Sequence, residues 1–212
     1  MYFFDLDGTL LDSNGVWSDI DREFLSRFGV TEVPEDYTDY VSHHSFPESA
    51  AYTRTRYHID MTDEEIMDSW RAMAREAYAQ TLELKPGVRE FLQRAQAAGK
   101  RCAVLSASIP AMCHMALERH GLLPYFEKLI TTQELGVEKW EPELYRKVEK
   151  LCGVSAEECI FFDDSPVNCA MAKQAGWQVY GVADHLYTGR EEEFLAACGA
   201  GNYPFSFWNS LP

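Results

Sequence analysis

The sequence predicts an α/β fold: a Rossmann-like parallel sheet with helices on both faces, plus an inserted all-α domain. After residue 85, short and nearly continuous apolar segments alternate with amphipathic helical segments, which is typical of a parallel sheet. Residues 15–84 show helical periodicity instead, and their charge composition differs from that of the rest of the chain. We therefore expect one domain formed by residues 1–14 and 85–212, and a second formed by residues 15–84.

Composition places the chain among compact globular proteins. Of its 212 residues, 46% are hydrophobic and 25% are charged, which is ordinary for a folded domain. No segment approaches the roughly 18 consecutive apolar residues of a membrane span, and the N-terminus lacks the basic leading segment of a signal peptide. The six cysteines form no C-x-x-C pair, so we expect reduced thiols and a cytoplasmic protein without a membrane partner.

Negative charge is concentrated in the N-terminal part of the chain. The formal net charge is −15, and residues 1–84 contain 18 acidic residues, 6 arginines and no lysine. An acidic surface disfavours nucleic acid, because cationic contacts to phosphates supply most of that affinity. The simplest interpretation is a solvated surface that keeps the protein soluble. Lys85, the first lysine, marks the expected boundary between the two domains.

The N-terminal part is predicted to contain a buried strand followed by helices. Residues 2–4 are expected to form the strand. A first helix is indicated by apolar residues three or four positions apart: Trp17, Ile20, Phe24 and Phe28. The aromatic residues among them are expected to pack in a core rather than to bind a substrate. Thr62 and Glu65 match a capping box, which predicts the start of another helix, and residues 31–60 are expected to be partly loop.

Strands and helices alternate from residue 86 onward. The predicted strands are residues 102–106, 128–131, 159–164 and 177–182. The helices are expected to begin near proline or a capping residue, at Pro86, Ser108, Pro142, residue 166 and Thr188. The apolar tail of residues 203–212 has no periodicity, and it is expected either to pack on the core or to form an interaction patch.

Reactive side chains lie at the ends of three predicted strands. Asp5 and Asp7 follow the first strand, Ser106 ends the second, and Asp163 and Asp164 end the segment 159–164. In an open parallel sheet, ligands bind beyond the carboxyl ends of the strands. If these strands are neighbours, four carboxylates converge and repel one another. A hard divalent cation such as magnesium is the natural counter-charge.

Four motifs occur in order along the chain: "FFDLDGTLLDS", "VLSAS", "GVEKWEP" and "FFDDSPVN". Together they resemble the four motifs of the haloacid dehalogenase-like (HAD) superfamily, in the branch with a helical cap inserted after the first motif. The pattern is similar to that of phosphoglycolate phosphatase and beta-phosphoglucomutase-like phosphatases, and it covers nearly the whole chain. The resemblance implies a Rossmann-like catalytic core of residues 1–14 and 85–212 and a helical cap of residues 15–84.

The resemblance implies a catalytic role for each motif. Asp5 would be the nucleophile that forms an aspartyl-phosphate. Asp7 would be the general acid for the leaving alcohol and then the general base for water. Ser106 and nearby backbone N–H groups, including that of Ala107, would hold the phosphoryl oxygens. Lys139 would neutralise Asp5 and the phosphate.

The resemblance also implies a magnesium site. Asp164 would bind the ion directly, together with Asp5 and the carbonyl group of Asp7. Asp163 would hold a metal-bound water. Asn168 lies in the same loop; we expect it to form local hydrogen bonds, and a contact with a motif residue is the alternative.

The chain departs from the family pattern after the motif lysine. The family usually has proline at this position, and this chain has Trp140. The loop is therefore expected to be less constrained, because proline fixes its own φ angle. Glu138 or Glu141 could then pair with Lys139 in place of Asp5.

The predicted cap offers weaker candidates. Arg54 or Arg56 could hold a second anionic group of a substrate. An equally good interpretation is that both are surface residues that balance the acidic charge of the cap.

These observations predict a magnesium-dependent phosphatase that acts on a small phosphorylated metabolite. Asp7 argues against a dehalogenase, whose pattern lacks the second aspartate. The absence of lysine from residues 1–84 argues against a phosphonate hydrolase that uses a cap lysine. A sugar-phosphate mutase of the same superfamily and a non-catalytic binding protein on the same scaffold remain alternatives. No motif specifies an oligomeric state.

Overall fold

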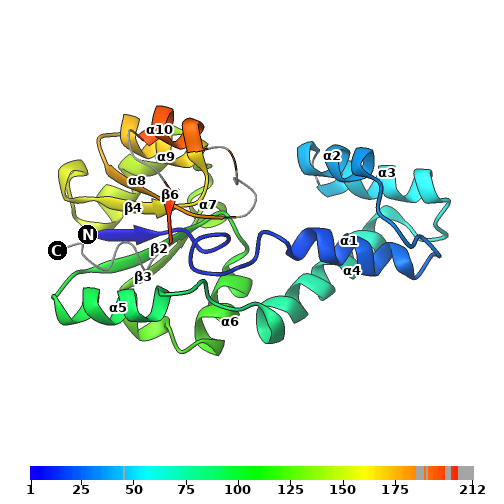
Figure 1. Ribbon diagram of the computed structural model, residues 1–212, viewed down its shortest axis with the longest axis horizontal. Helices are drawn as coiled ribbons and strands as arrows, with labels where there is room; N and C mark the ends of the chain where they lie inside the picture. The colour runs from blue at the N-terminus through cyan, green and yellow to red at the C-terminus, as the bar shows by residue number, and fades with distance from the viewer. Residues whose placement is uncertain (45, 185–188, 190, 199–201, 205–212) are drawn as a thin grey trace. The chain divides into compact units, whose positions relative to one another are not determined.

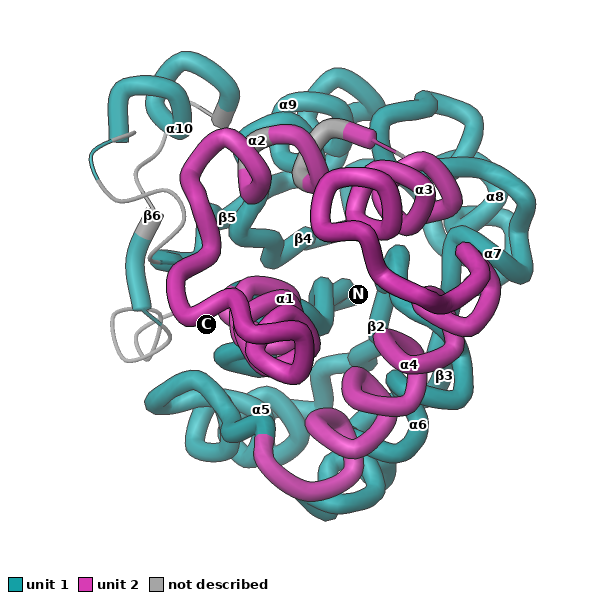
Figure 2. The backbone as a smooth tube through the Cα atoms, turned by 90° about the vertical axis from the view of Figure 1, so that its right-hand side faces the viewer, with its two compact units in different colours: residues 1–14, 82–212 teal, residues 15–81 magenta. Residues whose placement is uncertain are grey.

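A computed structural model describes residues 1–44, 46–184, 189, 191–198 and 202–204. The chain separates into two compact units (Figure 2). Unit 1 contains residues 1–14 and 82–212, and unit 2 contains residues 15–81. The expected beginning of the helix at Thr188 and nearly all of the expected apolar tail lie outside the described residues.

Unit 1 is built on a six-stranded parallel sheet with the order β3-β2-β1-β4-β5-β6 (Figure 1). The strands are β1 Tyr2–Phe4, β2 Cys102–Ser106, β3 Lys128–Thr131, β4 Ile160–Asp163, β5 Gln178–Val182 and β6 Asn202–Tyr203. The first five agree with the predicted strands to within one residue at each end, and the predicted α/β fold class is confirmed. Strand β6 was not predicted, because two residues are too few to produce a pattern.

Successive side chains of β1 pack on opposite faces of this sheet. Phe3 faces Trp177, with 4.7 Å between the ring centroids. Tyr2 and Phe4 both contact Phe91 on the other face. Since all three β1 residues are buried, the strand is apolar throughout, as a strand covered on both faces requires.

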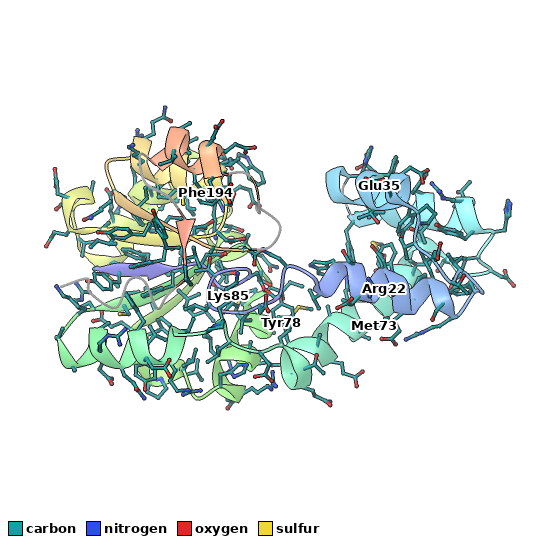
Figure 3. The ribbon with its side chains drawn as sticks, in the orientation of Figure 1. Arg22, Glu35, Met73, Tyr78, Lys85 and Phe194 are labelled. Carbon is teal, nitrogen blue, oxygen red and sulfur yellow. The ribbon has the colours of Figure 1, made fainter. Side chains whose placement is uncertain are left out.

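Helices cover both faces of the sheet (Figure 1). One face carries α5 (Val88–Ala97) and α6 (Pro110–Arg119), and the other carries α8 (Pro142–Cys152), α9 (Pro166–Gln174) and α10 (Glu191–Cys198). The short α7 (Thr132–Leu135) follows β3. Phe194 of α10 is buried in the same apolar cluster as Phe3 (Figure 3). Helix α5 begins two residues later than predicted from Pro86, because Gly87 has φ +89° and lies outside the helical region.

Unit 2 consists of four α-helices in its described residues. They are α1 Val16–Ser26, α2 Glu35–His43, α3 Phe46–Tyr57 and α4 Asp63–Glu76, and a π-helical turn over Ala77–Thr81 follows the last. The capping box of Thr62 and Glu65 is confirmed, with both reciprocal hydrogen bonds present. Residues 31–60 are partly loop, as expected: α2 and α3 form most of the segment, and its other described residues lie outside helices. Helix α3 buries small and polar side chains, Ser49, Ala50 and Thr53, so it shows no apolar stripe.

The aromatic residues of α1 differ from the prediction. Phe24 is buried, but Trp17 is 44% exposed and Phe28, beyond the end of the helix, is 40% exposed. The buried face of α1 is formed instead by Val16, Ile20 and Phe24, together with the neighbouring Leu25. Val16, Ile20 and Phe24, spaced four residues apart, therefore point inward, and Trp17 lies at the edge of this face.

The two chain segments that connect the units pair with each other inside unit 1. Leu11 and Leu84 form an antiparallel bridge, and the Lys85 backbone N–H donates to the Leu10 carbonyl at 3.0 Å. The Lys85 ammonium donates to Asp184, whose side chain is fully buried at the end of β5. These contacts fix both segments against the sheet.

Two further expectations concern cysteines and membranes. Five of the six cysteines have described side chains, and all five are buried free thiols. Among the described residues, no helix combines the length and the apolar character needed to cross a bilayer.

Candidate active site

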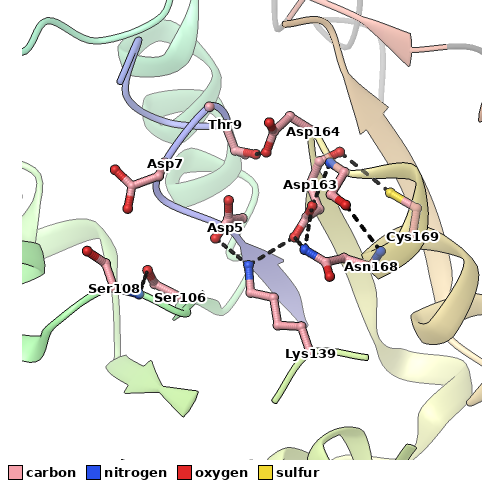
Figure 4. A network of polar contacts seen from close by, with 12 residues as sticks. Asp5, Asp7, Thr9, Ser106, Ser108, Lys139, Asp163, Asp164, Asn168 and Cys169 are labelled. Carbon is pink, nitrogen blue, oxygen red and sulfur yellow. Dashed lines mark hydrogen bonds and ion pairs between the residues drawn. The ribbon is translucent and has the colours of Figure 1, made fainter. Parts of the chain in front are cut away.

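Lys139 joins the ends of two neighbouring strands. Its ammonium group donates to the Asp5 carboxylate, which follows β1, and lies 3.0 Å from Asp163 Oδ2 at the end of β4 (Figure 4). All three side chains are buried. Strand order reverses between β1 and β4, because the chain places β2 and β3 on one side of β1 and then β4, β5 and β6 on its other side. This reversal is where open parallel sheets form their binding crevice.

Asp164 lies beside this group and is held by uncharged donors. The Thr9 hydroxyl lies 3.2 Å from Asp164 Oδ1, and the Asn14 amide nitrogen lies 2.6 Å from Oδ2. One carboxylate oxygen of each of Asp5, Asp163 and Asp164 lies within 4.8 Å of the others. We call these three residues the acidic cluster. The structure therefore brings together three of the four predicted carboxylates.

Asp7 is oriented differently from the acidic cluster. Its side chain points away from Asp163 and Asp164 (Figure 4), and its Oδ1 atom accepts a 2.7 Å hydrogen bond from the Ser13 hydroxyl. The Gly8 N–H donates to the same hydroxyl oxygen at 3.2 Å. In a regular strand Asp5 and Asp7, two positions apart, would lie on the same face. β1 ends at Phe4, so the turn that follows it directs the Asp7 side chain away from the acidic cluster.

The predicted phosphate-binding group lies at the end of β2. Ser106 is buried, and its hydroxyl oxygen accepts a 3.0 Å hydrogen bond from the Ser108 N–H. Ala107 between them is exposed. Because β1 and β2 are parallel neighbours, Ser106 and the turn after it lie at the same edge of the sheet as Asp5.

The electrostatics of the acidic cluster show a deficit of positive charge. Burial raises the pKa of Asp5 well above its usual value, although Lys139 opposes this shift. Burial, and then the charge of Asp163, raise the pKa of Asp164 to about 7. Burial alone would lower the pKa of Lys139, but Asp163 and Asp5 raise it. The single positive charge of Lys139 therefore does not balance the negative charge of the three buried carboxylates.

A divalent cation fits this cluster chemically. Oxygen donors from carboxylates are the ligands that magnesium prefers, and the three side chains supply them within a short distance of one another. A cation would also supply the missing positive charge, because buried carboxylates are stable only when paired or bound to a metal. The donor set and the raised pKa values of Asp5 and Asp164 thus agree with a magnesium site.

Three further residues support the site, and only Asn168 among them was a candidate from the sequence. The Asn168 amide nitrogen lies 3.1 and 3.2 Å from the two oxygens of Asp163, so the alternative of a contact with a motif residue is confirmed. The Ser165 N–H donates to Asp163 Oδ1 at 2.8 Å. The buried Tyr145 hydroxyl lies 2.8 Å from the Lys139 carbonyl oxygen. Tyr145 lies on α8, six positions after Lys139, and no motif in the sequence singled it out.

Lys139 reaches the acidic cluster although Trp140, and not proline, follows it. Trp140 is 60% exposed, whereas Lys139 is buried. Glu141 accepts a 3.0 Å hydrogen bond from the Glu138 N–H. The alternative pairing of Lys139 with Glu138 or Glu141 is therefore wrong, because Asp5 and Asp163 take that place.

The two candidate arginines of unit 2 both have carboxylate partners within that unit. The Arg54 Nε atom lies 2.6 Å from Asp63 Oδ1. The Arg56 guanidinium forms a two-point contact with Asp36, at 2.7 and 3.0 Å. These contacts match the interpretation that the arginines balance acidic charge, and a role in substrate binding stays a prediction.

The chain is similar to known sequences over most of its length. The profile of the haloacid dehalogenase-like hydrolase family matches residues 1–176. The chain is 28% identical over 176 residues to the GMP/IMP nucleotidase YrfG of Escherichia coli, covering 81% of this chain and 77% of that protein. It is 26% identical over 179 residues to the 6-phosphogluconate phosphatase of Escherichia coli, covering 84% and 80% of the two chains.

Solved structures show the same fold. A Thermotoga maritima protein provisionally assigned as a beta-phosphoglucomutase superposes with a TM-score of 0.85 at 22% identity, covering 100% of this chain and 99% of that one. CbbY from Rhodobacter sphaeroides, solved in complex with phosphate, superposes with a TM-score of 0.75 at 21% identity, covering 99% and 96%. With the family profile matched across most of its length, the chain belongs to the haloacid dehalogenase-like hydrolase family.

Proposed function

We propose that this protein is a magnesium-dependent phosphatase that hydrolyses a small phosphorylated metabolite through an aspartyl-phosphate on Asp5. The observation that carries the proposal is the buried acidic cluster, joined by Lys139 at the reversal of strand order. Family membership and the names of the curated relatives, which include phosphatases and a nucleotidase, support the same class of substrate.

Asp5 is suited to act as the nucleophile. Lys139 binds one of its oxygens and so fixes the orientation of the carboxylate at the end of β1. An oxygen of Asp5 attacks phosphorus, the bond from phosphorus to the leaving oxygen breaks, and the phosphoryl group is transferred to Asp5. Lys139 stays paired with this carboxyl group and stabilises the negative charge on the phosphoryl oxygens.

Asp7 would carry the protons. In its acid form it donates a proton to the leaving alkoxide, and the resulting carboxylate then removes a proton from the water that attacks the aspartyl-phosphate. This second step releases inorganic phosphate and restores Asp5. Ser106 and the N–H groups of the following turn would hold the phosphoryl oxygens while both transfers occur.

Magnesium would be held by Asp5, Asp164 and the Asp7 carbonyl group, with Asp163 holding a bound water. When bound, the ion neutralises the carboxylates and the phosphoryl oxygens, so that an anionic nucleophile can approach an anionic phosphate. Unit 2 would act as the helical cap that excludes bulk water during catalysis.

Phosphate release tests this proposal. Wild-type protein is assayed with an aryl phosphate and about a hundred phosphorylated metabolites, in magnesium and in EDTA. We expect magnesium-dependent release that Asp5→Asn abolishes, since the amide is a poor nucleophile. Turnover that persists in Asp5→Asn would contradict the mechanism, and no turnover with any substrate would favour a non-catalytic binding protein.

The sugar-phosphate mutase alternative is tested in the same reactions. A mutase needs a site for a second phosphate, and its candidates, Arg54 and Arg56, are each bound to a carboxylate. We therefore rank hydrolysis first. Conversion of a sugar monophosphate into its isomer without release of phosphate would reverse this order.

A further inference from the structure

Asn14 connects the beginning of the chain to Asp164, although 150 positions separate the two residues. It is the last residue of the first segment of unit 1. Its amide nitrogen lies 2.6 Å from Asp164 Oδ2, and Thr9 lies 3.2 Å from the other oxygen. Both oxygens of Asp164 are therefore held by the segment that follows β1, while the carboxylate itself comes from the end of β4.

Gly8 leaves the space in which this contact forms. A Cβ atom at position 8 would lie 2.1 Å from Asn14 Nδ2 and 2.3 Å from Asp164 Oδ2, distances that exclude it. The residue also has φ +77°, which disfavours any side chain. The turn after β1 is thus shaped so that the Asn14 amide and the Asp164 carboxylate can meet beside its backbone.

The donors around the acidic cluster are divided by charge. The cation Lys139 contacts Asp5 and Asp163, whereas Asp164 receives hydrogen bonds from the uncharged Asn14 and Thr9. An amide orients a carboxylate without supplying positive charge, so a bound cation would be the counter-charge of Asp164. Each carboxylate oxygen has two acceptor positions, and Oδ2 can therefore keep the amide on one and offer the other to a metal.

We propose that Asn14 is a positioning residue that holds the Asp164 carboxylate in the orientation in which it binds the divalent cation. This inference rests on the proposed function, because it assumes a metal at the acidic cluster. Hydrogen-bond partners of metal ligands fix ligand orientation, and their loss typically weakens metal affinity or activity by about 10–100-fold. Asn14 contacts the metal ligand and not the substrate, so its loss should affect metal binding first.

Magnesium binding without substrate tests the inference. Isothermal titration calorimetry with magnesium chloride compares wild-type protein with Asn14→Ala and Asn14→Leu, which lack the donor but differ in volume. We expect the dissociation constant for magnesium to rise about 10–100-fold in both variants. Gly15→Ala is the matched control, because a Cβ atom at position 15 has nothing within 4 Å; its affinity should stay within about twofold of wild type.

A second measurement separates positioning from a purely structural role. Phosphate release is measured across magnesium concentrations, and thermal unfolding is followed in EDTA and in magnesium. If Asn14 positions Asp164, the Asn14 variants should need a higher magnesium concentration for half-maximal phosphate release, with kcat largely recovered at saturating magnesium. Magnesium should also raise their thermal midpoint by less than it raises that of wild type. Asn14 variants that bind magnesium as tightly as wild type, or that melt lower by the same amount in both buffers, would overturn it.

The measurements on wild-type protein show whether the positioning role of Asn14 or the proposed function has failed. If wild-type protein binds magnesium and releases phosphate while the Asn14 variants bind equally well, the positioning role alone is refuted. If wild-type protein binds no magnesium, the metal part of the proposed function is refuted and the role of Asn14 is refuted with it.

Discussion

Replacing Lys139 by methionine removes the positive charge of the acidic cluster and keeps most of the side chain's apolar volume. Lys139 Nζ lies 3.0 Å from Asp163 Oδ2 and also contacts Asp5. At 3.0 Å the attraction of one such pair is about 5.5 kcal/mol at an effective dielectric constant of about 20. Dehydration of the ammonium offsets part of this energy. We expect a net loss of about 3–5 kcal/mol in unfolding free energy, as for other buried pairs that lose one partner.

Lys147→Met provides a matched control for this substitution. Lys147 also lies 3.0 Å from a carboxylate, that of Glu143, but the two side chains are 39% and 63% exposed. Solvent screens such a pair, so its loss should cost about 0–1 kcal/mol. The comparison keeps one ion-pair distance at 3.0 Å and varies burial, and Lys139 has Asp5 as a second carboxylate partner.

The loss caused by Lys139→Met should also depend on pH. Burial raises the pKa of Asp5 above its usual value, and removing the ammonium that opposes this shift raises it further. A carboxyl group whose pKa is higher in the folded than in the unfolded protein is increasingly destabilising as pH rises above the unfolded value. The variant should therefore lose more stability, relative to wild type, at pH 8 than at pH 5.

Urea unfolding in EDTA, followed by circular dichroism at both pH values, measures these differences. If Lys139→Met costs no more than Lys147→Met at either pH, Lys139 does not compensate the buried carboxylates and the electrostatic account is refuted.

Two further predictions concern Asp21 and Gly8. Burial raises the pKa of Asp21 from 3.8 to about 6, partly offset by the Tyr37 hydroxyl, which lies 3.3 Å away. The folded protein then binds more protons than the unfolded chain between about pH 4 and pH 6, so stability falls as pH rises through this window; the full shift corresponds to about 3 kcal/mol. Asp21→Asn should therefore stabilise the protein by up to about 3 kcal/mol in urea unfolding at pH 7.5 and by almost nothing at pH 4, and an equal gain at both would contradict this assignment. Gly8→Ala should lower the thermal midpoint strongly, because the new Cβ atom would lie 2.1 Å from the Asn14 amide and the backbone has φ +77°. The control is Gly15→Ala, because Gly15 has φ −83° and open space around it. This substitution should leave the thermal midpoint unchanged or raise it slightly. If the two substitutions change the midpoint equally, the Asn14–Asp164 contact does not constrain position 8.

The sheet was predictable because its strands are buried on both faces. Such strands appear in the sequence as continuous apolar runs, and their carboxyl ends carry Asp5, Ser106 and Asp163. Ordered motifs then identified the family and the hydrolase class, and the family match confirms both. Helices α2 and α3 were not predicted, because their inward positions are occupied by tyrosine, serine, threonine and alanine rather than by a regular apolar stripe.

The supporting contacts of the site were not predictable from sequence. The Asn14–Asp164 and Asn168–Asp163 hydrogen bonds depend on backbone turns whose direction is set only when the strands are assembled. Asparagine is also common in turns that bind nothing, so the sequence drew attention to Asn168 only through its motif and did not draw attention to Asn14. Roles in chemistry for Asp5, Asp7, Ser106 and Lys139, and the identity of the metal, stay predictions for the experiments above.

The central claim is that Asp5, Asp163 and Asp164 surround one divalent cation beside Lys139. Anomalous diffraction from crystals soaked in manganese chloride, which can replace magnesium at oxygen-rich sites, tests it most directly. We predict one strong peak within about 2.0–2.5 Å of carboxylate oxygens of Asp5 and Asp164. Crystals that bind manganese elsewhere, with no peak at the acidic cluster, would contradict the account.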